Sequence, residues 1–260
     1  MSADQLDATE ETSSEAVQEQ QAPPLFYSEP APVTAGTHGD FKIQPERDFS
    51  FTRETNAVPI TTPEFVLAAR HYPIVFVGDQ MVPTVALGFR HDQNLFVSED
   101  GAWERRCNTP AYVRRYPFIL LGKEGDERLQ LGVDNACQSD HADARALFDG
   151  ETETKVVTDA LELCQQFHSA YGATAEFSDM LAASGLMEER SLELELPGDE
   201  KMSIGAFSSI SEEKFREVPD AQILEWRSKG WLSAMYFHIA SLNNWEMLID
   251  RLPEVQVPAS

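Results

Sequence analysis

Positive charge is concentrated in one short stretch of an otherwise acidic chain. Four of the 20 basic residues fall within eleven positions, with three aromatic residues beside or among them. The set consists of Trp103, Arg105, Arg106, Tyr112, Arg114, Arg115 and Tyr116. Clustered guanidinium groups attract carboxylates and phosphates and bind them through paired donors. The stretch therefore predicts a site for an anion, a peptide carboxylate or a partner protein. The simpler interpretation is that the arginines pair with the chain's own surplus acidic groups, those of its N-terminal tail included.

No other group of residues has the spacing of a known catalytic or cofactor motif. The G-x-S-x-G, H-E-x-x-H, Walker and G-x-G-x-x-G patterns are absent from the sequence. Ser211 opens an S-x-x-K match, but capping of a short helix explains this serine without any catalytic role. We therefore expect no catalytic residue, no metal and no cofactor.

The histidines lack metal-ligand spacing. They are His38, His71, His91, His141, His168 and His238. His38, with Asp40 nearby, is expected to be solvated or to cap a local turn. His168 and His238 fall on predicted helices and could meet in space as a catalytic pair, although a satisfied histidine on a helix surface is the commoner arrangement.

Charge and composition limit the classes of function. The chain has 260 residues, a hydrophobic fraction of 42% and a net charge of −24, so it can form a sizeable core but repels phosphate backbones and anionic lipid. We expect no nucleic-acid binding and no membrane insertion. Residues 1–40 hold eight acidic and no basic residues, and predict a disordered acidic tail with local anchoring of Leu25, Phe26 and Tyr27.

The cysteines and the N-terminus indicate the compartment. Cys107, Cys137 and Cys164 form no C-x-x-C pattern and predict reduced, partly buried thiols. We find no secretory signal and no apolar run long enough to cross a bilayer. A cytoplasmic location is therefore expected.

One short pattern occurs twice and predicts how strands begin. Thr62-Pro63 and Thr109-Pro110 each precede a short apolar segment that ends at Tyr-Pro. The threonines are expected to cap a helix, and the prolines suit its first turn. The second proline of each copy stops the helix. Buried strands are then predicted at 74–77 and 118–121.

The remaining pattern predicts an α+β fold. Residues 71–135 indicate a mostly antiparallel sheet or small barrel. A long helix is expected from Lys155 to about Gly185, a β-hairpin at about 191–207, and three further helices, the last of them from Trp231 to Leu252. Residues 41–260 are expected to form a single domain, β-rich over 41–150 and helix-rich over 151–252.

Four of these stretches, in this order, resemble the bacterial SapC-like family. They read PITTPEFVLAARHYPIVF, ALGF…NLFV…DG.W, PAYVRRYPFIL and KGWLSAMYFHIASLNNW. The resemblance extends from about Phe41 to Leu252, with a departure at Cys107-Asn108-Thr109-Pro110. The family takes its name from surface-layer export loci. Its members also resemble products encoded beside halogenase-like proteins, cupin-like oxygenases and TonB-dependent receptors, and no catalytic residues carry over.

The resemblance implies an accessory or binding protein that acts with envelope-export or TonB-linked uptake systems. We expect its protein partner or small anionic ligand to contact the arginine–aromatic stretch around Trp103, Arg114, Arg115 and Tyr116. Two alternatives remain open. One is an enzyme acting on a peptide or amino-acid-derived substrate in a pathway with the halogenase-like or cupin-like proteins. The other is a purely structural scaffold. The oligomeric state does not follow from the sequence.

Overall fold

The computed structural model describes residues 24–44, 48–122, 129–195 and 201–252. Helices and antiparallel sheets are combined in it, which confirms the predicted α+β class. The sheets of the described residues are open and do not close into a barrel. The predicted turns at 123–126 and 197–199 lie outside the described residues.

The larger sheet has five strands in the order β11-β12-β4-β5-β3. Its strands are β3 (Ala57–Pro59), β4 (Ile74–Val77), β5 (Val82–Ala86), β11 (Met187–Glu195) and β12 (Lys201–Ile210). The predicted hairpin is confirmed as β11 and β12, which pair antiparallel. It joins the rest of the sheet where Ser208 of β12 pairs with Phe76 of β4. The central strand, β4, thus lies between the next strand of the chain, β5, and a strand from a distant part of it, β12.

A second sheet has three strands in the order β1-β7-β6, and two pairs of short strands accompany it. Its strands are β1 (Pro30–Pro32), β6 (Phe118–Leu121) and β7 (Gln130–Asp134); the short pairs are β2 (Lys42–Ile43) with β8 (Arg145–Ala146), and β9 (Phe148–Asp149) with β10 (Thr152–Glu153). Both strands predicted after Tyr-Pro are confirmed as β4 and β6. They lie in two different sheets, not in the one sheet expected over 71–135.

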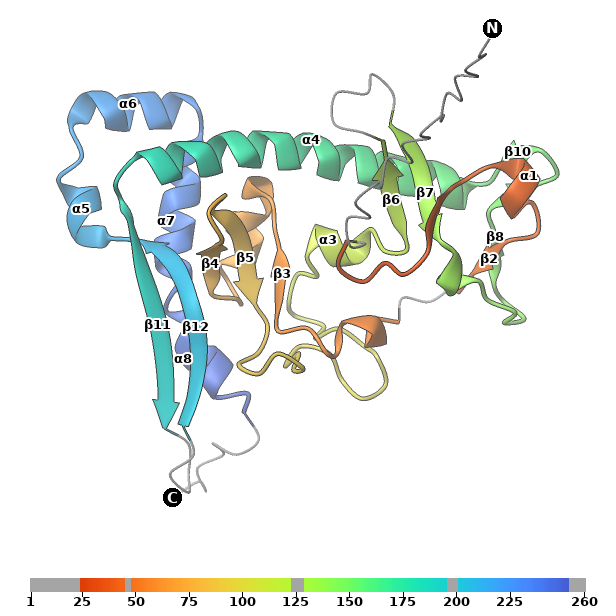
Figure 1. Ribbon diagram of the computed structural model, residues 1–260, viewed down its shortest axis with the longest axis horizontal. Helices are drawn as coiled ribbons and strands as arrows, with labels where there is room; N and C mark the ends of the chain where they lie inside the picture. The colour runs from red at the N-terminus through yellow and green to blue at the C-terminus, as the bar shows by residue number, and fades with distance from the viewer. Residues whose placement is uncertain (1–23, 45–47, 123–128, 196–200, 253–260) are drawn as a thin grey trace, which may run out of the picture.

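The helices are mostly short, with one exception. They are α1 (Ala35–His38), α2 (Phe65–Ala68), α3 (Ala111–Arg114), α4 (Lys155–Ala183), α5 (Glu212–Arg216), α6 (Asp220–Ser228), α7 (Trp231–Ser241) and α8 (Asn244–Ile249), with 3-10 turns η1 (Ser50–Thr52), η2 (Thr62–Glu64) and η3 (Asn135–Cys137). The 29 residues of α4 span roughly 43 Å at 1.5 Å per residue. Figure 1 shows α4 running past both sheets, from the α5–α7 group to β6, β7 and β10.

Helix α4 connects two hydrophobic clusters. Near its start, Val157 and Cys164 pack with the three-stranded sheet. Near its end, Phe177 and Leu181 pack with the five-stranded sheet and the C-terminal helices. Between them, Phe167 contacts α3. One face of α4 thus packs against the three-stranded sheet near its start and against the five-stranded sheet near its end. The helix thereby holds the two sheets in one arrangement.

The two Thr-Pro copies are joined by a single carboxylate. Glu64 is buried and accepts hydrogen bonds from the Thr61 backbone N–H at 2.9 Å and the Thr61 hydroxyl at 3.0 Å. Its other oxygen accepts the backbone N–H of Ala111 at 2.6 Å. Ala111 occupies in the second copy the position that Glu64 occupies in the first. The predicted caps are therefore wrong: Thr61, not Thr62, caps the first helix, and Glu64, not Thr109, binds the free amide of the second.

The C-terminal helices bind the backbone that leads into β4. The Asn244 amide nitrogen donates to the carbonyls of Ala69 and Tyr72, both at 2.9 Å. The Ser241 hydroxyl accepts the Ile74 N–H at 3.0 Å. Since buried backbone groups need partners, these side chains satisfy positions that sheet pairing leaves open. The helix predicted over 231–252 is accordingly two helices, α7 and α8, separated just before Asn244.

His238 adds two bonds on the same face of α7. Its Nδ1 lies 2.9 Å from the Ile74 carbonyl, and its Nε2 accepts the Ile210 N–H at 3.1 Å. A carbonyl only accepts and an amide only donates, so the ring must be neutral with its proton on Nδ1. Burial lowers the pKa of His238 to about 4, and the bond to Ile74 offsets part of this shift.

Residues 24–40 differ from the sequence prediction of a disordered tail. Within this range β1 pairs with β7, and α1 follows. Tyr27 is buried and donates to the Phe118 carbonyl at 2.6 Å. The buried Asp134 carboxylate accepts the backbone N–H groups of Ser28 and Glu29, both at 2.9 Å. Such long-range bonds cannot be read from the acidic composition that predicted disorder.

The Asn244 bonds give a direct test of this arrangement. Asn244→Ala leaves two buried carbonyls without donors, so we expect it to lower the free energy of unfolding by about 2 kcal/mol. The adjacent Asn243→Ala is the matched control, because Asn243 is exposed and its amide donates only to the Ala240 carbonyl. Urea denaturation measures both. Equal effects of the two substitutions would contradict the assignment.

His238 also predicts a pH dependence of stability. The unfolded chain takes up a proton at this histidine near pH 6.5, but the folded protein only near pH 4. His238 therefore contributes fully to the free energy of unfolding above pH 6.5. This contribution is lost progressively as the pH falls to 4, by on the order of 3 kcal/mol in total. His238→Gln should remove this part of the pH dependence of the unfolding free energy. His168→Gln, on the exposed face of α4, should leave it unchanged. An NMR titration midpoint near 6.5 for His238 would refute the assignment.

Candidate functional site

The seven residues of the predicted arginine–aromatic site lie in two places. Trp103, Arg105 and Arg106 line a surface hollow with a volume of about 910 Å³. The hollow is formed by residues 95–106, and we call it the arginine hollow. The other four residues, Tyr112, Arg114, Arg115 and Tyr116, lie on α3 and directly after it.

A tight turn shapes the arginine hollow. Val97 and Trp103 form an isolated antiparallel bridge, and the Ser98 N–H donates to the Ala102 carbonyl at 3.0 Å. Gly101 closes the turn with φ +81, a backbone conformation that favours glycine. A side chain at this position would also collide with Asp48, so the turn and the η1 region fit closely together.

The aromatic floor of the hollow is part of the core. Trp103 is buried, and its indole N–H donates to the Tyr72 hydroxyl at 3.0 Å. That hydroxyl in turn donates to the Asn108 carbonyl at 2.9 Å. Burial raises the pKa of Tyr72, so the phenol stays neutral and able to donate. Trp103 therefore positions the hollow, and only its edge faces outward.

The acidic groups of the hollow have partners. Glu104 lies 3.9 Å from the Arg251 guanidinium. Asp100 accepts the Ser98 hydroxyl at 2.5 Å, and this bond lowers the pKa of Asp100. Arg105 and Arg106 are exposed and make no hydrogen bond or ion pair with any other residue in the described part of the chain. The hollow thus has cationic donors available for an anion.

Sequence reasoning missed Arg251, which reaches the hollow from the end of the chain. Its guanidinium lies 4.3 Å from the centre of the Phe96 ring, and it donates to the Cys107 sulfur at 3.9 Å. A separation of 144 residues from Cys107 leaves no local signal for this contact.

Arg115 occupies an aromatic cage. Its guanidinium lies 4.2 Å from the centre of the Tyr112 ring and 4.4 Å from that of Phe167, with Tyr27 at 5.8 Å. Its Nε is buried and has no hydrogen-bond partner among the residues that the structure describes. Cation–π attraction stabilises the charge in this position. Arg114 differs: its Nε donates to the Thr109 carbonyl at 3.1 Å, which ties α3 to the preceding turn.

Tyr116 is part of the hydrogen-bond network around Asp134 that holds the residues before β1. Its hydroxyl lies 3.4 Å from the Asp134 carboxylate and accepts the Cys137 thiol at 2.9 Å. Burial raises the pKa of Tyr116 and of Cys137. These groups are therefore neutral, and their hydrogen bonds connect β7, η3 and the residues before β1.

The burial of His38 and His238 and the exposure of His168 decide what these histidines do. Both His238 nitrogens bond to backbone, whereas His168 is exposed on α4, so they do not form a pair. His38 is buried, not solvated: its Nε2 lies 3.0 Å from the Asn135 side-chain oxygen, and its Nδ1 accepts the Thr34 N–H at 3.4 Å. In the described ranges, no group of three His, Cys, Asp or Glu side chains is placed to hold a metal ion.

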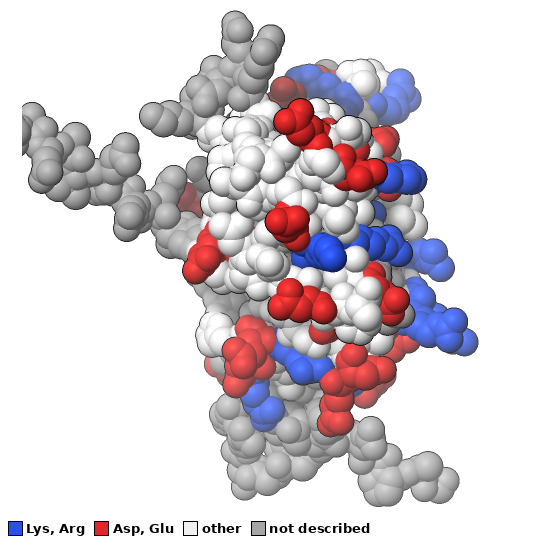
Figure 2. All heavy atoms as spheres, turned by 90° about the vertical axis from the view of Figure 1, so that its right-hand side faces the viewer, with Lys and Arg blue, Asp and Glu red and all other residues white. Residues whose placement is uncertain are grey.

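Acidic and basic side chains are arranged differently at one end of the molecule. Figure 2 shows the end of the molecule that forms the right-hand side of Figure 1. Acidic side chains are spread across this face, while basic side chains gather along one edge of the view. Against this background, Arg105 and Arg106, which have no acidic partner among the described residues, are a local feature of the hollow.

The fold and the hollow define an α+β protein with a surface depression that carries two arginines without a partner among the described residues. The SapC family model matches residues 33–248, and the chain belongs to this family. The comparisons found no match among curated proteins and none among solved structures. Across the described residues, no helix is both long enough and apolar enough to traverse a bilayer.

The reactivity of the three cysteine thiols tests how deeply the structure buries them. Burial raises the pKa of Cys107, Cys137 and Cys164, that of Cys164 from 9.0 to about 11. Since the thiolate reacts, alkylation of Cys164 at pH 8 should be roughly 100-fold slower in the folded protein than in urea. Iodoacetamide labelling followed by mass spectrometry measures each site. A native Cys164 that reacts as fast as the unfolded one would refute its buried placement.

Proposed function

We propose that this SapC-family protein is an accessory binding protein that holds an acidic segment of a partner protein in the arginine hollow. The observation that carries the proposal is the state of Arg105 and Arg106. Both are exposed at the hollow and form no bond to other described residues. Guanidinium groups bind carboxylates through paired, charge-assisted hydrogen bonds.

Local charge outweighs the net charge at this site. The chain carries −24, which opposes the approach of any anion at long range. At physiological ionic strength, charges more than about 8 Å away are largely screened. Among the lining residues of the hollow, Glu104 has an ion-pair partner in Arg251, whereas Asp100 keeps its negative charge although it accepts the Ser98 hydroxyl. A carboxylate in the hollow is therefore attracted by Arg105 and Arg106, which have no partner among the described residues, and is repelled mainly by Asp100.

A peptide suits the hollow better than a nucleic acid. A phosphate backbone extends well beyond the hollow and meets the acidic remainder of the surface, which repels it. A short acidic peptide places its charges only on the arginines. The resemblance to products of surface-layer export loci supports a partner in envelope-export or TonB-linked uptake systems.

Paired substitutions test the site. We expect fluorescein-labelled hexaglutamate to bind the full chain, and Arg105→Ala with Arg106→Ala to weaken this binding about tenfold, as loss of two charged contacts implies. Hexaglutamine is the neutral control peptide. Arg216→Ala with Arg227→Ala is the matched control protein, since both arginines are exposed on other helices. Fluorescence anisotropy provides the dissociation constants.

Two outcomes would contradict the proposal. If the two double substitutions weakened hexaglutamate binding equally, the binding would reflect the overall charge of the protein and not the arginine hollow. Absence of hexaglutamate binding, together with oligomers in solution, would favour the scaffold function. A photocrosslinker at the exposed Ala102 of the hollow, used in the native host, tests the partner's identity. Adducts only with proteins outside export and uptake systems would exclude that assignment.

A further inference from the structure

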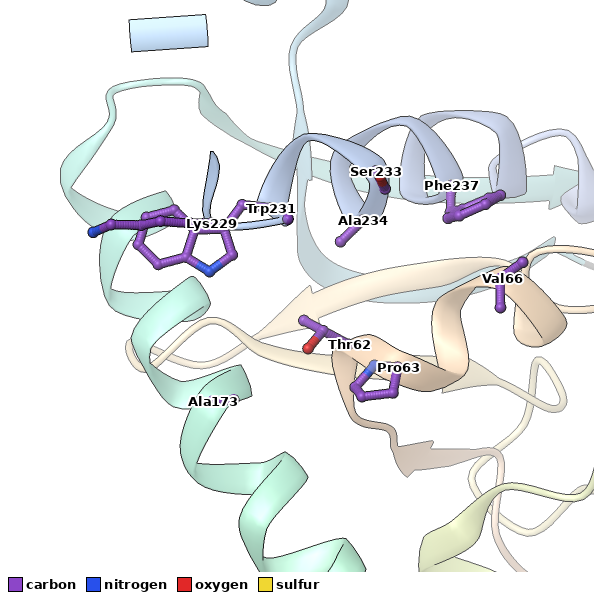
Figure 3. Close-up of a pocket in the computed structure, with 10 residues that line it drawn as sticks. Thr62, Pro63, Val66, Ala173, Lys229, Trp231, Ser233, Ala234 and Phe237 are labelled. Atoms are coloured by element: carbon purple, nitrogen blue, oxygen red, sulfur yellow. The ribbon is translucent and has the colours of Figure 1, made fainter. Parts of the chain in front are cut away.

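A second concavity, independent of the arginine hollow, lies where three helices meet. Its volume is about 350 Å³. We call it the helix-junction groove; it is lined mainly by Thr62, Val66, Ala173, Trp231, Ala234 and Phe237. Figure 3 shows the η2–α2 side chains facing those of α7, with α4 alongside and Trp231 at one end.

Small residues on α4 and α7, and in the turn before α7, leave room for the groove. Ala173 and Ala234 come from α4 and α7, and Gly230, with φ +76, turns the chain between α6 and α7. A hydrogen bond from the Thr62 N–H to the Thr174 hydroxyl, at 2.9 Å, fixes the η2 turn against α4. The walls are thus held in place by the fold itself, and the groove is preformed.

The groove combines an apolar lining with one cation. Val66 is 48% exposed, which is unusual for a valine that faces a concavity. At the end of the groove the Lys229 ammonium lies 4.3 Å from the centre of the Trp231 ring. Its acidic neighbour Glu225 is 3.6 Å away, with side-chain exposures of 49% and 58%. An ion pair this exposed is weak and exchanges readily with another carboxylate.

We infer that the helix-junction groove binds a small molecule with a flat apolar body and one carboxylate. The apolar body covers Val66 and Phe237 and stacks against Trp231, and the carboxylate meets Lys229. The size of the groove favours this class of ligand, because about 300 Å³ is the lower limit for small-molecule pockets and is too small for a docked helix. Burial of apolar surface provides the affinity, and the lysine sets the orientation.

Matched probes separate the apolar and the charged contributions. 2-Naphthoate and 2-naphthamide have the same aromatic body, and only the first carries a charge. We expect saturable binding of both to the full chain by NMR titration, with 2-naphthoate roughly threefold tighter, as an exposed ion pair implies. Lys229→Gln should abolish this difference. Lys214→Gln, on α5 and exposed, is the matched control and should preserve it.

A blocking substitution tests the location. Ala173→Trp fills the groove from an exposed position on α4 and should weaken both probes at least tenfold; Ala175→Trp, exposed two positions on, lies outside the lining and should not. Failure of wild-type protein to bind 2-naphthoate at millimolar concentration would overturn the inference. So would unchanged binding by the Ala173 variant, or an acid preference that survives Lys229→Gln.

Discussion

The structure depends on hydrogen bonds between side chains of α7 and α8 and the backbone entering the central strand. His238, Ser241 and Asn244 recur every three residues and bond to backbone groups within residues 69–74. Each group is buried, where an unpaired donor or acceptor would cost about 1–3 kcal/mol. Because His238 also binds Ile210, α7 fixes the β11–β12 hairpin beside β4. These contacts join the first and the last of the family-like sequence stretches, which are far apart in the chain.

Local signals in the sequence predicted local structure. Proline stops placed the strands at 74–77 and 118–121, helical periodicity placed α4, and strict alternation placed the hairpin. Long-range bonds were not predictable, since their partners are distant. Glu64 caps a helix 47 residues away, and Asp134 orders backbone more than 100 residues away. The acidic composition that predicted disorder over residues 1–40 gave no sign of β1 and α1, which form within 24–40.

The candidate site, too, could be predicted from the sequence only in part. Arginine and aromatic residues serve both ligand binding and packing, so their clustering in sequence does not distinguish the two uses. In the fold, aromatic rings enclose Arg115, and Trp103 belongs to the core. Arg105 and Arg106 face outward because the turn before them ends in a buried tryptophan. Of the predicted positions, Trp103 thus determines the shape of the hollow, while its open donors come from Arg105 and Arg106.

Both proposed binding surfaces are built on the same frame. One face of α7 holds β4 through His238 and Ser241, and another face, with Phe237, lines the helix-junction groove. Tyr72, whose carbonyl is bound by the C-terminal helices, extends its hydroxyl to Trp103 beneath the arginine hollow. A ligand at either place meets side chains whose backbone is already fixed, so binding orders little of the protein. Under the two proposals, preorganisation of this kind reduces the number of contacts that an anion needs on a strongly acidic protein, because the local geometry is already in place.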